Sequence, residues 1–129
     1  IAALKKAIEA LKIVNEFNIS IDEWHHKHKK DTPSGTAKTL SDKIKKATGK
    51  KEIEISSKRA GGIFGIHTIS AIGDHEYLQL SHHALDRAVF AEGALKAASW
   101  LTHQPKGFYG MDNLVSDLES AVPKKVDKK

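Results

Sequence analysis

A strand-like stretch leads directly into a cluster of histidines and then into the start of an amphipathic helix. Phe17, Ile19 and Ile21 alternate with polar residues, which is the pattern of a strand buried on one face. Further along, apolar residues recur at the spacing of one helical face and stop at Gly49. They are Ala37, Leu40, Ile44 and Ala47. A strand and a helix therefore bracket residues 23–37, and the rest of the chain is predicted to support this segment.

The turn before the predicted helix has the composition of an anion site. Pro33 pushes Thr32 out of helical geometry, and Ser34 or Thr36 can cap the helix that follows. The first backbone N–H groups of a helix have no intrahelical partner, and Gly35 lets a ligand approach them closely. We therefore predict that Ser34, Gly35 and Thr36 bind a carboxylate or another small anion.

Histidines and lysines gather between the strand and this turn. Histidine is the side chain best suited to proton transfer near neutral pH, and Lys29 supplies a second positive group four residues after His25. His25 and Lys29 are accordingly predicted to be catalytic, and His26 is predicted to contact the substrate. A solvated basic turn is the alternative interpretation. A metal site formed by His25, His26 and His28 is not expected, because the adjacent lysines repel a cation and no carboxylate completes a familiar spacing.

The remaining elements follow from the same periodicities. Predicted strands cover residues 17–24, 53–59, 66–72 and 77–80. The last two are expected to form a hairpin through residues 73–75. Residues 2–15 and 86–101 are predicted helices, the second apolar nearly all round and therefore buried against the sheet. Residues 61–65 are glycine-rich but lack the G-x-G-x-x-G spacing, which favours a loop. The segment 105–115 is predicted to be rich in turns, with packing anchors at Phe108, Tyr109 and Met111.

Together these elements predict an α+β domain over residues 1–122, with a mixed open sheet of about four strands and helices on one face. The other face carries too many apolar residues to be left in water, so we expect a partner subunit to cover it in an oligomer. Residues 123–129 are expected to form a polar, disordered tail. The chain begins with Ile1, already inside an amphipathic pattern, and is therefore expected to be a piece of a longer protein.

Composition narrows the function classes. The chain has no cysteine, which excludes disulfides and thiolate metal sites and fits a cytoplasmic location. No apolar run approaches the roughly 20 residues that span a bilayer, so no membrane partner is expected. The net charge of +5 leaves a nucleic-acid- or polyanion-binding module as the alternative function. Against that alternative, the lysine clusters lack interleaved aromatic residues on which bases could stack.

The segment of residues 23–37 resembles the signature of the dihydrodipicolinate reductase family, whose enzyme is also called 4-hydroxy-tetrahydrodipicolinate reductase. The matching positions are Glu23, His25, His26, Lys29, Asp31, Pro33, Ser34, Gly35, Thr36 and Ala37. Further matches are Arg59, Gly61, Gly65, His67, Thr68, Ser81, His82, Ala84, Arg87, Phe90, Ala91, Gly93 and Ala94. Ser20 and Thr32 depart from the usual pattern without removing a functional group. The resemblance covers roughly residues 10–115.

This resemblance implies an oxidoreductase of lysine and diaminopimelate biosynthesis that reduces a cyclic imine dicarboxylate with NADPH or NADH. It further implies that His25 donates the proton, that Lys29 assists as a second acid and that His26 contacts the substrate. By the same resemblance, Gly35 and Thr36 bind a substrate carboxylate. The family's sheets pack against one another in a homotetramer, which agrees with the covered sheet face expected above, and no nucleic-acid partner is implied.

The nucleotide-binding half of the family precedes the region that this chain resembles. Nothing in the sequence supplies a strand, a G-x-G-x-x-G turn and a helix in that order. The main site for NADPH or NADH is therefore expected outside this chain. The chain itself is expected to be the substrate-binding and oligomerisation domain, inactive when isolated.

Overall fold

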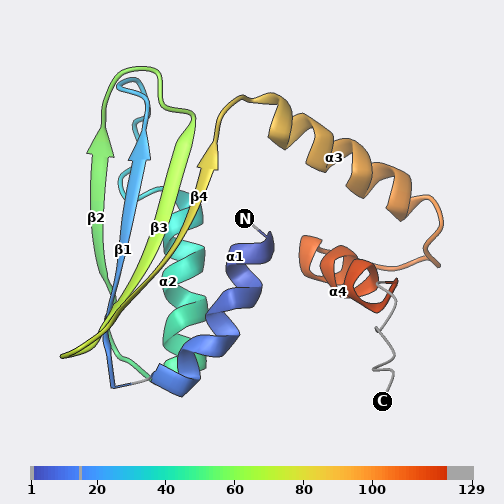
Figure 1. Cartoon of the computed structure of the whole chain (residues 1–129). Coiled ribbons are helices and arrows are strands. Elements are labelled where there is room, and N and C mark those ends of the chain that lie inside the picture. Colours follow the sequence, from blue (N-terminus) through green and yellow to red (C-terminus); the bar gives the residue numbers. More distant parts are fainter. Residues whose placement is uncertain (1, 15, 122–129) are drawn as a thin grey trace, which may run out of the picture. The chain divides into compact units, whose positions relative to one another are not determined.

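The structure, a computed structural model, describes residues 2–14 and 16–121, and the chain divides after Arg87 into two compact units (Figure 1). The first unit holds the sheet and the helical segments before it and within it, and the second holds two helices. The range 1–122, expected to be one domain, therefore contains two units. The predicted tail, residues 123–129, lies outside the described residues.

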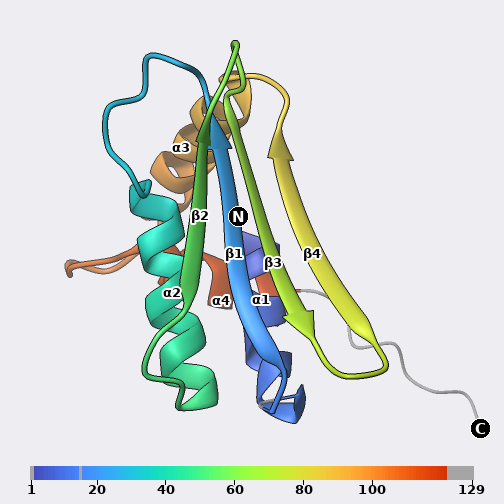
Figure 2. The same cartoon turned by 90° about the vertical axis from the view of Figure 1, so that its left-hand side faces the viewer.

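The first unit is built on a four-stranded mixed sheet (Figure 2). Its strands are β1 (Asn18–His25), β2 (Glu54–Arg59), β3 (Gly65–Ile72) and β4 (Tyr77–Ala84). In the order β2-β1-β3-β4, β1 runs parallel to β2 and antiparallel to β3, and β3 runs antiparallel to β4. The predicted α+β class with a mixed open sheet is confirmed.

Alternation along β1 decides which of its side chains meet the helices. Ile19, Ile21, Glu23 and His25 are all buried, and successive side chains of a strand point to opposite faces. These four therefore share the face that the helices α1 (Ala2–Ala7) and α2 (Gly35–Thr48) cover, on one side of the sheet in Figure 1. The apolar core lies between this face and the helices. Glu23 and His25 are polar residues at the end of an otherwise apolar row.

The parallel pair β1 and β2 is joined by the helix α2 (Gly35–Thr48). Ser34 is its N-cap and accepts a hydrogen bond from the Ala37 amide at 3.2 Å. Gly49 ends the helix with a positive φ of 76° and donates to the Lys45 carbonyl. The apolar face is fully buried at Ala37, Leu40 and Ile44. Both predicted ends of this helix are confirmed.

Residues 2–15, predicted to be one helix, form two segments over their described part. These are the α-helix α1 (Ala2–Ala7) and the 3-10 helix η1 (Ile8–Val14). Leu4, Ile8 and Leu11 are buried in the same core as β1 and α2. The predicted apolar face of this segment is therefore confirmed, although its helical type changes along its length.

The predicted hairpin joins β3 and β4, and its turn is closed by a hydrogen bond from the Gly73 amide to the Glu76 carbonyl at 2.9 Å. A Cβ atom at Gly73 would lie 2.8 Å from the ring of Phe17. The position therefore needs glycine because of close packing. The strand β4 extends four residues beyond the predicted end at residue 80 and reaches Ala84.

The sheet face away from the helices differs from the expectation of an apolar surface. Its side chains are mostly polar, and Thr68 hydrogen-bonds Ser81 at 2.8 Å while Ser70 hydrogen-bonds Tyr77 at 3.1 Å. The register sends Ile69 to the helix side together with Ile19 and Ile21, while Ile66 and Ile72 point to the other face. Exposed apolar side chains on this face include Trp24, Ile72 and Tyr77.

The second unit contains α3 (Ala88–Leu101) and α4 (Met111–Ala121). The helix α3 belongs to this second unit and has no buried residue, so its burial against the sheet of the first unit stays a prediction. Within the unit, Trp100 donates to Asp117 at 2.8 Å and its ring meets the Tyr109 ring edge-on. Polar contacts and one aromatic pair thus join α3 to the segment that follows it.

The helix α4 replaces part of the turn-rich segment predicted over residues 105–115. Its one buried residue in the described range is Leu114, while Phe108, a predicted packing anchor, is fully exposed. Tyr109 does pack, against Trp100. None of the described helices is long and apolar enough to cross a bilayer.

Candidate active site

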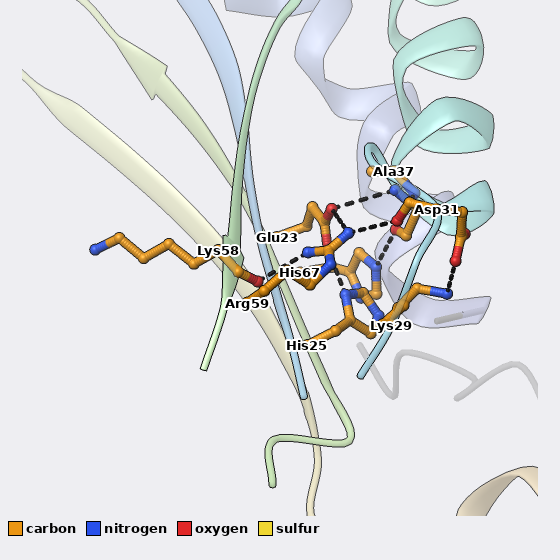
Figure 3. A network of polar contacts seen from close by, with 9 residues as sticks. Glu23, His25, Lys29, Asp31, Ala37, Lys58, Arg59 and His67 are labelled. Atoms are coloured by element: carbon orange, nitrogen blue, oxygen red, sulfur yellow. Dashed lines mark hydrogen bonds and ion pairs between the residues drawn. The ribbon is translucent and has the colours of Figure 1, made fainter. Parts of the chain in front are cut away.

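The side chains of Glu23 and His25 meet at the end of β1. They stand two residues apart, so both point to the helix-covered face. Glu23 is fully buried and His25 is 7% exposed. His25 Nδ1 and Glu23 Oε2 are hydrogen-bonded (Figure 3). Because an ionised carboxylate only accepts, Nδ1 is the donor, which leaves Nε2 as the ring nitrogen that can face a ligand.

Arg59 closes the other side of Glu23. It is the register partner of His25 on the neighbouring strand β2. Its guanidinium donates from Nη2 to Glu23 Oε1 at 2.8 Å and from Nη1 to Oε2 at 3.1 Å. It also donates to the backbone carbonyl of Asp31 at 2.6 Å. This two-point pairing fixes the carboxylate plane and ties the loop after β1 to β2.

The Glu23 carboxyl stays ionised in this setting. Burial by itself would raise its pKa, but hydrogen bonds from Arg59, His25 and the Ser34 backbone lower the pKa to about 2. At neutral pH the group is therefore an anion with an adjacent cation. It acts as a fixed acceptor and does not exchange protons with a substrate.

Ser34 connects the start of α2 to this network. Its amide donates to Glu23 Oε1 at 3.2 Å, and its hydroxyl both caps α2 and bonds His67 Nε2 at 3.2 Å. The residue is 2% exposed. Ser34 was predicted to bind substrate directly, but its amide and hydroxyl are both engaged within the fold. We therefore interpret it as a residue that holds the helix start beside β1.

His67 lies on β3 with its ring edge-on to His25, at 5.1 Å between centroids. Burial and the nearby His25 lower its pKa to about 4, against an opposing effect of Glu23. His67 is therefore neutral near pH 7. Its Nδ1 is buried and has no hydrogen-bond partner among the described residues. In this arrangement His67 packs against His25 and does not supply a proton.

The Nε2 atom of His25 has no hydrogen-bond partner in the described part of the chain, and it is not one of the buried unpaired atoms. It lies beside Gly65, where an added Cβ would stand 3.3 Å away. A larger residue at position 65 would therefore press on this nitrogen. Proton transfer from His25 to a bound molecule is geometrically possible at Nε2 alone, since Nδ1 is held by Glu23.

Among the described residues, Lys29 pairs with Asp31 and makes no hydrogen bond with His25. Its ammonium points to Asp31, at 2.7 Å from Oδ1 (Figure 3). The Lys29 hydrogen bond, with a smaller contribution from the Gly35 backbone, lowers the pKa of Asp31. A carboxylate of the chain thus already lies against the helix start that was predicted to bind an anion. The space over Gly35 is open, because an added Cβ there would meet no atom within 4 Å.

His26 faces a shallow pocket of about 510 Å³ that is separate from the buried network. His28, Phe64 and Arg87 also line it, and the Arg87 guanidinium lies 5.9 Å from the Phe64 ring centre. Burial, followed by the charges of Arg87 and neighbouring residues, lowers the pKa of His26. The pocket therefore offers a permanent cation in Arg87 and a neutral hydrogen-bonding ring in His26.

The arrangement of these side chains also shows whether they could bind a metal ion. Within residues 2–14 and 16–121, one group of side chains has its possible metal-ligand atoms all within 4.8 Å of one another: Glu23, His25 and His67. This group differs from the set of His25, His26 and His28 that was considered in the sequence analysis. The Arg59 guanidinium occupies both oxygens of Glu23, and Nδ1 of His25 is used as a donor. A cation would have to displace both. The donor set is a closed hydrogen-bond network and does not suit a metal.

Comparison with known proteins supplies the family. Residues 1–115 match the sequence model described as dihydrodipicolinate reductase, C-terminus. This chain belongs to that family. It is 46% identical over 109 residues to the 4-hydroxy-tetrahydrodipicolinate reductase of Bdellovibrio bacteriovorus, covering 84% of this chain and 48% of the relative. The enzyme of the same name from Rickettsia rickettsii is 41% identical over 121 residues, covering 84% and 51%.

Wolinella succinogenes has a further reductase of this family, 40% identical over 133 residues, with coverage of 88% of this chain and 52% of the relative. The chain thus spans about half the length of the curated relatives it matches. Among solved structures, the dipicolinate-bound dihydrodipicolinate reductase of Paenisporosarcina sp. TG-14 shares the fold at a TM-score of 0.71 and 23% identity. That match covers 88% of this chain and 50% of the other.

Three members of this site match the family in sequence but were not predicted to have a function: Glu23, Arg59 and His67. The contact of Glu23 with His25 could have been predicted from sequence. In a strand, a carboxylate two residues before a histidine points to the same face of the sheet as that histidine. Arg59 lies 36 residues away in sequence, and only the parallel pairing of β1 and β2 brings it to Glu23. No local pattern could have indicated that contact.

Proposed function

We propose that this chain is the substrate-binding domain of a 4-hydroxy-tetrahydrodipicolinate reductase, an oxidoreductase of lysine and diaminopimelate biosynthesis in the cytoplasm. The reaction is the NAD(P)H-dependent reduction of 4-hydroxy-tetrahydrodipicolinate to tetrahydrodipicolinate. The observation that carries the proposal is His25, which is anchored at Nδ1, open at Nε2 and placed beside the start of α2. The relatives' names and the family match support it.

In the proposed mechanism, bound NADPH or NADH supplies the hydride. His25 donates a proton to the substrate from Nε2 and keeps the hydrogen on Nδ1, where Glu23 accepts it. Lys29 assists as a second acid and as a positive charge beside the substrate. Its present partner, Asp31, is more than half exposed and can be replaced by a substrate carboxylate.

The two carboxylates of the substrate are proposed to bind at two different places. One meets the backbone of Gly35 and the hydroxyl and backbone of Thr36, where the helix start favours an anion. The Gly35 backbone contributes to the lowered pKa of Asp31, so the helix start already favours the charged form of a nearby carboxylate. The other carboxylate is proposed to meet His26 and Arg87 in the shallow pocket.

The described residues of this chain do not form a site that could bind the pyrophosphate of NADPH or NADH. β1, α2 and β2 do form a parallel strand-helix-strand unit, the arrangement on which dinucleotide sites are built. However, the turn into α2 contains Gly35 as its single glycine, and the neighbouring Ser34 amide is committed to Glu23. A pyrophosphate needs a glycine-rich turn with free amides. We therefore propose that NADPH or NADH binds mainly outside this chain.

The function is tested by titration calorimetry of this chain with pyridine-2,6-dicarboxylate and with NADPH. We expect binding of the dicarboxylate and little or no binding of NADPH. Thr36→Val and Lys29→Ala should each weaken dicarboxylate binding, by about tenfold or more for the lysine, because a charge-assisted hydrogen bond is lost.

Lys30→Ala is the matched control, since Lys30 is an exposed lysine of the same loop. It should leave the affinity nearly unchanged. Tight NADPH binding, or dicarboxylate binding that ignores both Thr36→Val and Lys29→Ala, would place the site elsewhere.

We further propose that the chain assembles as a homotetramer through the sheet face away from the helices. Trp24, Ile72 and Tyr77 are exposed there beside a row of hydroxyl groups, a mixture of apolar and polar surface that resembles an interface. Analytical ultracentrifugation at micromolar concentration should give a species near four times the chain mass of 14.2 kDa. Trp24→Lys should shift the population toward monomer, and a monomeric wild-type chain would refute the assembly.

A further inference from the structure

We propose that Glu23, held by Arg59 and by the Ser34 amide, is the positioning residue that fixes the His25 ring with its hydrogen on Nδ1 and Nε2 toward the substrate. The inference deepens the proposed function and rests on it for the role of His25. Glu23 touches neither substrate nor cofactor in this account. It acts through His25 alone.

The hydrogen bonds of the Glu23 carboxylate are complete. Oε1 accepts from Arg59 Nη2 at 2.8 Å and from the Ser34 amide at 3.2 Å. Oε2 accepts from Arg59 Nη1 at 3.1 Å and from His25 Nδ1. A carboxylate offers about four acceptor positions, and all of them are used. Glu23 can therefore not release His25 without leaving a buried donor unpaired.

The same geometry specifies the protonation state of the His25 ring both before and after the proton is transferred. As a proton donor, His25 begins as an imidazolium with hydrogens on both nitrogens, and Glu23 is the anion beside it. When the Nε2 hydrogen passes to the substrate, the neutral ring must be the tautomer with hydrogen on Nδ1. Glu23 favours that tautomer, because it can only accept. Free imidazole rings have no such constraint.

Other charged or titratable groups around His25 do not replace Glu23 in this role. Arg59, from β2, is a cation that is paired with Glu23 itself. His67, from β3, has a pKa of about 4 and is neutral. His26, the next residue along the loop, has a lowered pKa and faces the shallow pocket. Among the described residues around His25, Glu23 is thus the one anion that hydrogen-bonds the ring.

The test is a long-range proton–nitrogen NMR spectrum of this chain labelled with ¹⁵N-histidine, in which His25 is assigned by its loss in His25→Gln. In the wild type, the neutral His25 ring should carry its hydrogen on Nδ1. In Glu23→Gln, whose side chain has the same shape without the charge, the tautomer should become mixed or reverse. A wild-type ring protonated on Nε2, or a tautomer unchanged by Glu23→Gln, would overturn the proposal. If the variant fails to fold, the wild-type spectrum alone still tests whether the hydrogen of the neutral ring is on Nδ1.

Kinetics in the intact enzyme provide the second readout. Glu23→Gln should lower kcat on the order of 10²-fold with Michaelis constants little changed, because an oriented proton donor is lost while binding groups remain. Asp22→Asn is the matched control: a neighbouring carboxylate on the opposite sheet face, which should leave kcat unchanged. A normal kcat in Glu23→Gln would overturn the positioning role.

These outcomes are distinguishable from failure of the proposed function. If His25→Ala also kept normal turnover, the assignment of His25 itself would be wrong. The NMR result would still report whether Glu23 controls the tautomer, since that measurement needs no activity. Loss of activity in His25→Ala with normal activity in Glu23→Gln would refute only the inference about Glu23.

Discussion

Replacing His25 by alanine in the intact enzyme should lower turnover by about 10²- to 10⁴-fold, the range that general acid catalysis contributes. The reason is local: Nε2 of His25 is open beside the start of α2 while Nδ1 is held by the buried Glu23. The affinity for NADPH should hardly change, because the main nucleotide site is proposed to lie outside this chain. Steady-state kinetics with separate Michaelis constants for both substrates would measure this.

His75→Ala is a suitable control for that experiment, because His75 is an exposed histidine in the β3–β4 turn. It should leave turnover unchanged. Lys29→Ala should also lower turnover, by a smaller factor than His25→Ala, since Lys29 is assigned a supporting role. Near-normal turnover in His25→Ala would remove the proton donor from the account.

Replacing Arg59 by methionine should destabilise the fold by about 3 kcal/mol or more at neutral pH. Removing one partner of a buried ion pair leaves the other charge uncompensated, and such changes cost about 3 to 5 kcal/mol. Here the remaining charge would be that of the Glu23 carboxylate. This group is fully buried, and Arg59 is the only arginine or lysine that hydrogen-bonds it among the described residues. Urea unfolding followed by circular dichroism would measure the difference. Lys58→Met, a neighbouring cation on the opposite face of β2, should cost much less.

The Arg59→Met effect should depend on pH in a defined direction. The pKa of Glu23 is lowered from 4.5 to about 2, so its pairing stabilises the folded state fully above pH 4.5 and is lost as pH falls toward 2. The gap between wild type and variant should therefore shrink over that range. His67, with its pKa lowered from 6.5 to about 4, destabilises the wild type as pH falls from 6.5 to 4. A gap that stayed constant from pH 7 to pH 2 would contradict the assigned pairing.

Local pattern was sufficient for the elements that frame the site. The alternation around Ile19 and Ile21 indicated β1, and the Ser34 cap with Gly49 indicated both ends of α2. These signals act between neighbours in the chain, which is why they can be read from sequence. The position of His25 at the strand end followed from them.

Contacts over long sequence separations could not be read in the same way. Glu23 meets Arg59 across 36 residues, and Ser34 meets His67 across 33. Both depend on the strand order β2-β1-β3, which periodicity does not specify. The cap formed by Ser34 could be predicted locally, but the second contact of the same hydroxyl, with His67, could not.

The second unit shows a different reason for error. The apolar pattern of α3 indicated a helix correctly, but composition cannot say which surface covers that helix, and none of its residues is buried in the second unit. The helix α4 was missed because glycines and Pro105 precede it closely and dominate the local turn signal. Apolar surface that is exposed in one chain can be buried by another copy or by a further domain.

The central claim is that a dicarboxylate binds between the start of α2 and His25. The most direct test is an amide chemical-shift map of the ¹⁵N-labelled chain during titration with pyridine-2,6-dicarboxylate, which detects weak binding as well as tight binding. The account predicts that the largest changes occur at Gly35 and Thr36, with further changes at His26 and Lys29. Changes concentrated instead on the lysine-lined groove between η1 and α2, near Lys12 and Lys46, would contradict it.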